Sequence, residues 1–183
     1  NTGSSNTFVG TGAGGNNVSG HRNNVLGHAA GENMLSGSDN VFIGQFAGFS
    51  TDSTSQNIAI GTQAGENNIR SGNIFIGHLA GQANTTGLDN TFIGRFAGMS
   101  NSIAVGNTFI GMNAGLVNTV GSLNTFVGRA AGGANISGLG NTFLGAEAGG
   151  SNEAGSFNTF VGSKAGDFNT FDNNNTFIGY SVG

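Results

Sequence analysis

The chain has 183 residues, of which 36 are glycine and only 8% are charged, and its formal net charge is −4 at pH 7. Since 36% of the residues are hydrophobic and so few are charged, the composition excludes an intrinsically disordered chain. Collagen is excluded because glycine does not fall at every third residue and proline is absent. The basic residues are few and scattered, so we expect no nucleic-acid surface, and no apolar run is long enough to insert into a membrane as a helix.

One nine-residue motif repeats along the whole chain: Asn, Thr, Phe, an aliphatic residue, Gly, two variable residues, Ala and Gly, as in segment 107–115. The opening Asn recurs every 17 residues, except for one interval of 16 between Asn57 and Asn73. The repeats begin at Asn6, Asn23, Asn40, Asn57, Asn73, Asn90, Asn107, Asn124, Asn141, Asn158 and Asn175. A fixed period of this length is the signature of a solenoid. We number the positions of each repeat from this Asn.

Each repeat is predicted to begin with a short strand at positions 2–4, from 7–9 in the first repeat to 176–178 in the last. These positions hold β-branched and aromatic residues and end at a glycine, which favours a strand over a helix. Later segments such as 84–87 and 135–138 are interpreted as a second, weaker strand followed by a turn. Each strand should pair in parallel with its copy in the next coil, giving an all-β parallel β-solenoid of about eleven 17-residue coils.

Several positions hardly vary. Positions 5 and 9 are Gly in all eleven repeats, position 4 is always aliphatic, and position 8 is Ala in ten. Position 3 is Phe in nine repeats, with Val25 and Ala59 as the exceptions. We predict that the nine form a stacked ladder: Phe8, Phe42, Phe75, Phe92, Phe109, Phe126, Phe143, Phe160 and Phe177. The Asn at position 1 should form a ladder of side-chain amides, although Asn is also simply a good turn residue.

The strands have two apolar faces. Positions 2 and 4 point to one side and position 3 to the other, because side chains alternate along a strand. Only one face can fill the coil interior, and soluble monomers rarely expose an apolar patch of more than a few hundred Å². The outer face runs the length of the rod, so an identical parallel chain is its simplest cover. This pattern predicts self-association.

Two segments, 57–61 (Asn-Ile-Ala-Ile-Gly) and 102–106 (Ser-Ile-Ala-Val-Gly), resemble head repeats of trimeric autotransporter adhesins. The full motif at 90–98, preceded by 84–87, is more similar to repeats of tail-fibre-domain proteins of phages and of bacterial surface or injection-system fibres. The resemblance covers the entire chain and implies a left-handed β-roll homotrimer that is extracellular. Two features depart from the adhesins: the longer period, and Phe where they usually have Ala. Their Ala face looks toward the partner chains, so the resemblance implies that Phe does so here.

The chain offers no pattern for catalysis or metal binding. The three His residues are interpreted as solvated side chains, since His28 and His78 share position 6 but lie three coils apart. The nine acidic residues form no column, and neither the calcium-binding nonapeptide nor a glycosidase-like carboxylate pair is present. Cys is absent, which removes disulfides and thiolate sites. We therefore expect no catalytic residue, no metal and no cofactor.

The ends of the chain lack the capping repeats that a solenoid requires. Residues 1–3 read as the end of a preceding repeat, and Gly183 closes a motif. We therefore expect 1–183 to be a single repeat domain, an uncapped segment of a longer fibre.

Recognition should use the variable positions, chiefly 6, 7 and 10. The candidate receptor contacts are Phe46, Phe49, Phe96 and Met99, which occupy positions 7 and 10 of two repeats three coils apart. Exposed aromatic rings suit a sugar or protein ligand. Alternatively, Phe46 or Phe49 could fold inward and fill the gap that Ala59 leaves in the Phe ladder.

Two classes of function compete. The first is a non-catalytic structural or adhesive segment of an extracellular fibre, on a bacterial surface or on a phage or injection-system tail fibre, where it attaches to a host glycan or protein receptor. The second is a stand-alone solenoid that binds ice or a polysaccharide, or a single-chain structural filament. The Thr column at position 2 is interrupted by Asn24, Val41, Ile58 and Ile74. A flat binding face should not be interrupted in this way, so we favour the first.

Overall fold

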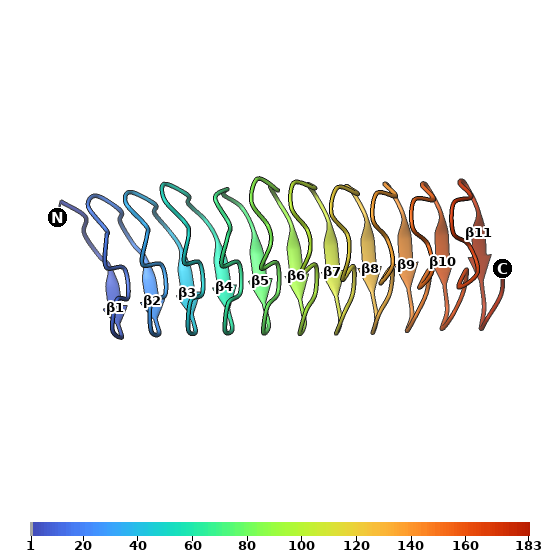
Figure 1. The fold of residues 1–183 in the computed structure, drawn as a ribbon, viewed down its shortest axis with the longest axis horizontal. Coiled ribbons are helices and arrows are strands. Elements are labelled where there is room, and N and C mark those ends of the chain that lie inside the picture. Colours follow the sequence, from blue (N-terminus) through green and yellow to red (C-terminus); the bar gives the residue numbers. More distant parts are fainter. Residues whose placement is uncertain (1) are drawn as a thin grey trace.

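The computed structural model describes residues 2–183, which form a rod of stacked coils (Figure 1). Each repeat makes one coil and contributes one three-residue strand to an 11-stranded parallel sheet, in which the strands lie in sequence order. The strands are β1 (Thr7–Val9), β2 (Asn24–Leu26), β3 (Val41–Ile43), β4 (Ile58–Ile60), β5 (Ile74–Ile76), β6 (Thr91–Ile93), β7 (Thr108–Ile110), β8 (Thr125–Val127), β9 (Thr142–Leu144), β10 (Thr159–Val161) and β11 (Thr176–Ile178). The described part of the chain has no helix, and so none that could cross a membrane. The predicted all-β solenoid is confirmed. Below, each coil is numbered by the strand that it contains, so coil 4 contains β4.

The register keeps equivalent positions together. In β7 and β8, for example, Thr108 pairs with Thr125 and Phe109 with Phe126. The pairing of β4 with β5 stays in the same register although that repeat is one residue shorter, with Ile58 opposite Ile74. The shortened coil therefore does not shift the pattern of inward and outward side chains.

The second strand predicted within each repeat is not formed in the described coils, so that prediction was wrong. At positions 13 and 14, two successive N–H groups share one acceptor: the amides of Thr85 and Thr86 both donate to the carbonyl of Ser102, at 2.9 and 3.1 Å. A strand ladder spreads its bonds over successive carbonyls. Sharing one carbonyl bends the chain instead, so this side of the coil is a turn.

The Phe column fills the inside of each coil. Seven of the nine rings are at most 1% exposed, and Phe8 and Phe177 in the first and last coils are partly buried. Phe109, Phe126 and Phe143 stack as predicted, with ring centroids 4.8 Å apart and planes within 6° of parallel. The partner-facing orientation that the adhesin resemblance implied for Phe is therefore wrong. The outward side of the sheet carries positions 2 and 4.

The glycine at position 9 explains why Phe lies inside. A Cβ on Gly115 would stand 2.4 Å from the ring of Phe109, so only glycine leaves room for the ring within its own coil. Glycine is required at position 5 for a different reason. Gly111 has φ of 137°, a conformation that L side chains rarely adopt, and its Cβ would meet the carbonyl oxygen of Gly128 in the next coil at 2.4 Å.

The gap at Ala59 is closed by a neighbouring ring. A Cβ on Gly65, in the same coil as Ala59, would meet Phe75 of the next coil at 2.5 Å. Phe75 is also tilted by 32° against Phe92, with their centroids 5.4 Å apart. The Phe75 ring thus leans toward coil 4 and covers the gap at Ala59. Phe46 and Phe49 stay partly exposed and lie outside the buried column.

Two Asn columns tie the coils together. At position 1, the backbone N–H of each Asn donates to the Oδ1 of the Asn one coil earlier, at 2.8–3.0 Å along the whole rod. Among the described residues, the amide-to-amide ladder expected there occurs only in the first coils, between Asn6, Asn23 and Asn40. Its continuous form lies at position 12, from Asn68 to Asn152, with Nδ2–Oδ1 distances of 2.7–3.0 Å.

In the shortened coil 4 the turn changes at Arg70. Ile69 donates to Thr85 as position 13 does elsewhere, and the Ser71 hydroxyl accepts from the Ser55 amide as position 16 does. Arg70 alone therefore spans positions 14 and 15. The position-1 ladder continues across this coil, since the Asn73 amide donates to the Asn57 Oδ1 at 2.9 Å. The Asn57 Nδ2, however, has no hydrogen-bond partner among the described residues.

Candidate functional site

The outer face of the sheet carries two columns of side chains along the rod. Position 4 is aliphatic in every coil. Its side chains are exposed in six coils, by 52% at Val9, 37% at Ile110 and 47% at Leu144, and are half-buried in the other five. Position 2, beside it, is Thr in seven coils and Asn, Val or Ile in the others. Neither column contains a charged residue. The face is therefore long, uncharged and apolar along one edge.

The first predicted contact pair, Phe46 and Phe49, lies together on the rod surface. Their rings meet edge to face with centroids 5.6 Å apart, and both side chains are half-buried. The exposed His28 of the preceding coil packs edge-on against Phe46 at 5.4 Å. The structure thus brings the two Phe together and adds a His. The three rings form a small aromatic platform that is partly open to solvent.

The second pair, Phe96 and Met99, repeats this arrangement three coils later. His78 packs edge-on against Phe96, again at 5.4 Å, and the guanidinium of Arg95 lies 5.0 Å from the centre of the same ring. Both Phe96 and Met99 are half-buried. An edge-on His and a cation over the ring favour one fixed orientation of Phe96.

The backbone at position 7 positions both rings. Phe46 and Phe96 have φ of 56° and 61°, the left-handed conformation found at position 7 of every coil. In both platforms the Phe amide donates to the carbonyl of the His, at 3.0 Å. The His partners were missed from sequence, where they were read as solvated. The available signal was the spacing of 18 residues from His28 to Phe46 and from His78 to Phe96, one coil plus one residue.

The most exposed aromatic side chains lie elsewhere, and the sequence reasoning did not select them. Phe157, Phe168, Phe171 and Tyr180, in coils 9–11, are 59%, 82%, 63% and 76% exposed. They stand at positions that hold small or polar residues in most coils. No ring-to-ring contact joins them in the described part of the chain. They are separate exposed rings and do not form a platform.

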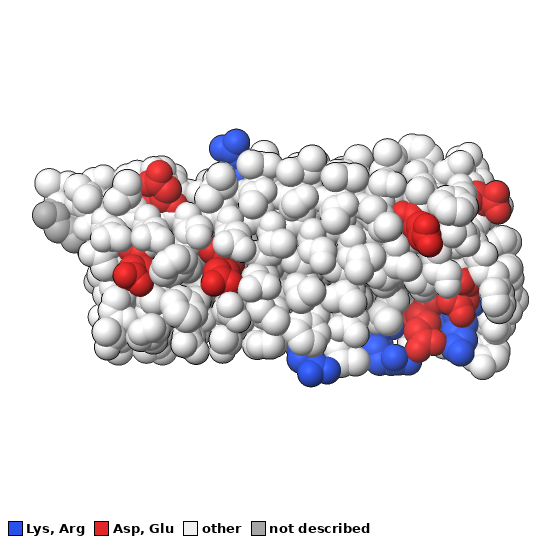
Figure 2. All heavy atoms as spheres, in the orientation of Figure 1, with Lys and Arg blue, Asp and Glu red and all other residues white. Residues whose placement is uncertain are grey.

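Charged side chains are few and leave much of the surface uncharged (Figure 2). Arg129 and Lys164 both pair with Glu147, and the hydrogen bond from Arg129 holds the pKa of the Glu147 carboxyl below its usual range. Arg22 bonds both oxygens of Asp39, at 2.6 and 2.8 Å, and lowers the pKa of that carboxyl likewise. These exposed pairs contribute little to stability. Within residues 2–183, no group of three His, Cys, Asp or Glu residues could hold a metal ion.

Comparison with known proteins finds no match: no family model, no curated protein and no solved structure matches the chain.

Proposed function

We propose that the chain is a non-catalytic structural segment of an extracellular fibre, in which three parallel copies associate through the outer faces of their sheets. The observation that supports this proposal is the unbroken aliphatic column at position 4, which runs through all eleven coils and is exposed in six of them and half-buried in the other five. A monomer has no need for such a column, because Phe already fills the coil interior. Exposed apolar surface of this extent is typical of an association site.

The period of the rod favours a second copy of the same chain as the partner. Equivalent residues recur about every 4.8 Å along the axis, as the Phe stacking shows. A partner with the same period can match every coil of the column, whereas an unrelated globular surface can match only a few. The absence of charge from positions 2 and 4 also removes electrostatic repulsion between identical faces.

The extracellular setting is supported by the resemblance to tail-fibre and adhesin repeats, on a bacterial surface or on a phage or injection-system particle. The segment would project a receptor-binding region or carry one, for a cell-surface glycan or protein. Within this role, the platforms at Phe46–Phe49 and Phe96–Met99 are the proposed contacts, because aromatic rings held at a surface suit sugars and apolar side chains.

The molar mass in solution tests the association. Light scattering at micromolar concentration should give three times the chain mass. Ile110→Lys places a charge in the middle of the outer face and should dissociate the assembly without unfolding it, since Ile110 is already 37% exposed. Val120→Lys is the matched control, since Val120 is 46% exposed away from the strands and should leave the mass unchanged. A wild-type monomer, or dissociation by Val120→Lys alone, would contradict the proposal.

A stand-alone solenoid that binds ice or a polysaccharide is the second candidate. One observation favours it: the Thr side chains of β6 to β11 form six consecutive outward positions, from Thr91 to Thr176. A regular hydroxyl column beside methyl groups could order water or a polymer. A monomer that shapes ice crystals, and loses this effect in Thr125→Lys, would support this candidate over the fibre.

Truncation of the rings separates recognition from packing at the two platforms. Removing a fully buried Phe costs about 3–5 kcal/mol of folding stability, and removing an exposed one costs little. We expect Phe49→Ala to lower stability measurably, because its ring packs against Phe46. Unchanged thermal stability with weakened glycan or cell binding, in either Phe49→Ala or Phe96→Ala, would instead mark a recognition contact.

A further inference from the structure

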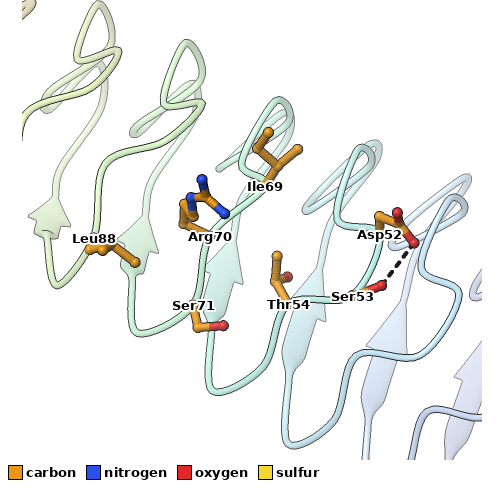
Figure 3. Close-up of a pocket in the computed structure, with 7 residues that line it drawn as sticks. All are labelled: Asp52, Ser53, Thr54, Ile69, Arg70, Ser71 and Leu88. Carbon is orange, nitrogen blue, oxygen red and sulfur yellow. Dashed lines mark hydrogen bonds between the residues drawn. The ribbon is translucent and has the colours of Figure 1, made fainter.

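We propose that the hollow at the shortened coil binds a carboxylate-bearing sugar at the end of a glycan chain. The hollow has a volume of about 420 Å³ and is lined by Asp52, Ser53, Thr54, Ile69, Arg70, Ser71 and Leu88, from coils 3, 4 and 5 (Figure 3). This volume falls within the range of small-molecule sites. The inference gives the proposed receptor-binding role a ligand class and rests on it for biological meaning.

The missing residue of coil 4 creates the hollow. Thr54 occupies position 15 in coil 3, where six other coils have Gly. In those coils a Cβ would collide with the neighbouring coil: on Gly121, it would stand 2.4 Å from the carbonyl oxygen of Gly138. Coil 4, the next coil along the rod, has one residue fewer at this point, and the Thr54 side chain lines the hollow beside it. Its hydroxyl is buried, yet it has no hydrogen-bond partner among the described residues.

Arg70 supplies the charge that recognises a carboxylate. The other four basic side chains each have a partner: Arg22 with Asp39, Arg129 and Lys164 with Glu147, and Arg95 with Phe96 and Met112. Of the five Lys and Arg side chains, all within residues 2–183, only that of Arg70 has no ion pair, hydrogen bond or ring contact. A guanidinium fork matches a carboxylate with two parallel hydrogen bonds.

The remaining walls suit the rest of a sugar ring. The Asp52 carboxylate accepts a hydrogen bond from Ser53 at 3.1 Å and keeps free lone pairs for sugar hydroxyls. The Ser71 hydroxyl lies on the opposite wall (Figure 3). Ile69 and Leu88 are 42% and 39% exposed and offer an apolar surface to the C–H face of a ring. Asp52 disfavours a doubly charged phosphate, so a ligand with one carboxylate and several hydroxyls fits best.

Titration with two matched sugars tests the site. Methyl β-glucuronoside and methyl β-glucoside differ only in the carboxylate, and both have the capped anomeric oxygen of a glycan residue. Binding is followed by NMR through the backbone amides of Ser53, Thr54 and Ser71. The glucuronoside should bind at least about tenfold more tightly than the glucoside, and Arg70→Gln should remove that difference, as the loss of one charge-assisted contact implies.

Two further variants test whether glucuronoside binding depends on the hollow and on Arg70 in particular. Insertion of one Gly between Arg70 and Ser71 restores the 17-residue period, fills the hollow and should abolish binding while Arg70 is still present. Arg22→Gln removes a guanidinium from another part of the surface and should bind normally. Equal binding of both sugars, or glucuronoside binding that survives the Gly insertion, would overturn the proposal.

The proposed sugar site and the proposed trimer can be refuted independently of each other. The same titration on Ile110→Lys measures sugar binding whether or not the chain associates. Glucuronoside binding by a wild-type chain that is monomeric would support the site and refute the trimer, and a wild-type trimer without glucuronoside binding would do the reverse.

Discussion

Coils 6 to 10 are close to an ideal stack, whereas coils 2 to 5 contain most of the irregularities of the rod. From Phe92 to Phe160 the rings lie 4.8 Å apart with planes 4–8° from parallel, and the Asn ladder at position 12 is continuous from Asn101 to Asn152. In coils 2 to 5, Val25 and Ala59 interrupt the Phe column, Met34 and Thr51 replace Asn at position 12, and coil 4 lacks one residue.

The difference shows what the repeat fixes and what it leaves free. The backbone register is the same in both regions, so the strand pairing tolerates a missing ring and a shortened turn. The departures change the surface instead: the hollow and the Phe46–Phe49 platform both lie in the irregular region. The repeated backbone contributes stability in both regions, and the shortened coil adds the hollow.

The largest effect should come from breaking the regular stack. Phe126→Ala removes a ring that is 0% exposed and stacks on a ring at each side, and should cost about 3–5 kcal/mol of folding stability. Val25→Ala, in the irregular region, removes fewer buried atoms and should cost less. Chemical denaturation of the two variants measures the difference. Equal losses would mean that the Phe stack does not distinguish the regions.

The next effect concerns the glycine beneath each ring. Gly115→Ala forces a Cβ to within 2.4 Å of Phe109 and should destabilise the fold by about 1–3 kcal/mol through overpacking. Gly133→Ala is the control, because a Cβ there meets nothing closer than 3.2 Å and the residue has an ordinary φ. Thermal unfolding should separate the variants, and similar melting temperatures would show that the ring can move aside.

Filling the gap in coil 4 should make the two regions more alike. Ala59→Phe restores the ring that nine of the eleven coils carry, above Gly65, where the Phe75 ring now lies. Phe75 would then stand upright, and we expect a gain of about 1–2 kcal/mol from the added buried surface, less some repacking cost. Denaturation midpoints measure the gain. Destabilisation would mean that the lean of Phe75 is fixed by other contacts.

The smallest effect belongs to the exposed ion pairs. The pKa of Glu147 is lowered in the folded chain, chiefly by the hydrogen bond from Arg129. Its contribution to stability is therefore present above the ordinary carboxyl pKa of about 4.3 and is lost as the pH falls through the lowered value. Glu147→Gln should remove this part of the acid dependence, whereas Glu153→Gln, at a carboxylate without an ion pair in the described chain, should not. Stability measured between pH 7 and pH 2 in both variants compares them.

The fold could be predicted from sequence because its cause is local and repeated: three strand-forming residues and two glycines recur in every coil. The side of each strand that points into the coil could not be predicted, because Phe and the aliphatic residues are both apolar. The alternation of side chains along the strand does not decide between them. The deciding contact is the Phe109 ring over Gly115, which forms across a turn. The His28–Phe46 contact and the hollow at Arg70 were missed because both join neighbouring coils, and they become visible only when the repeats are aligned as stacked layers.

The shortened coil also decides how the rod carries mechanical load. Within residues 2–183, each strand contacts only the strands before and after it, so tension along the axis passes through every interface between coils in series. The interfaces from coil 5 to coil 9 combine contacts between Phe rings with paired Asn side-chain amides. Coil 4 has Ala59 in place of a ring and leaves the Asn57 Nδ2 without a partner among the described residues. A pulled rod should therefore part first beside coil 4, next to the hollow at Arg70.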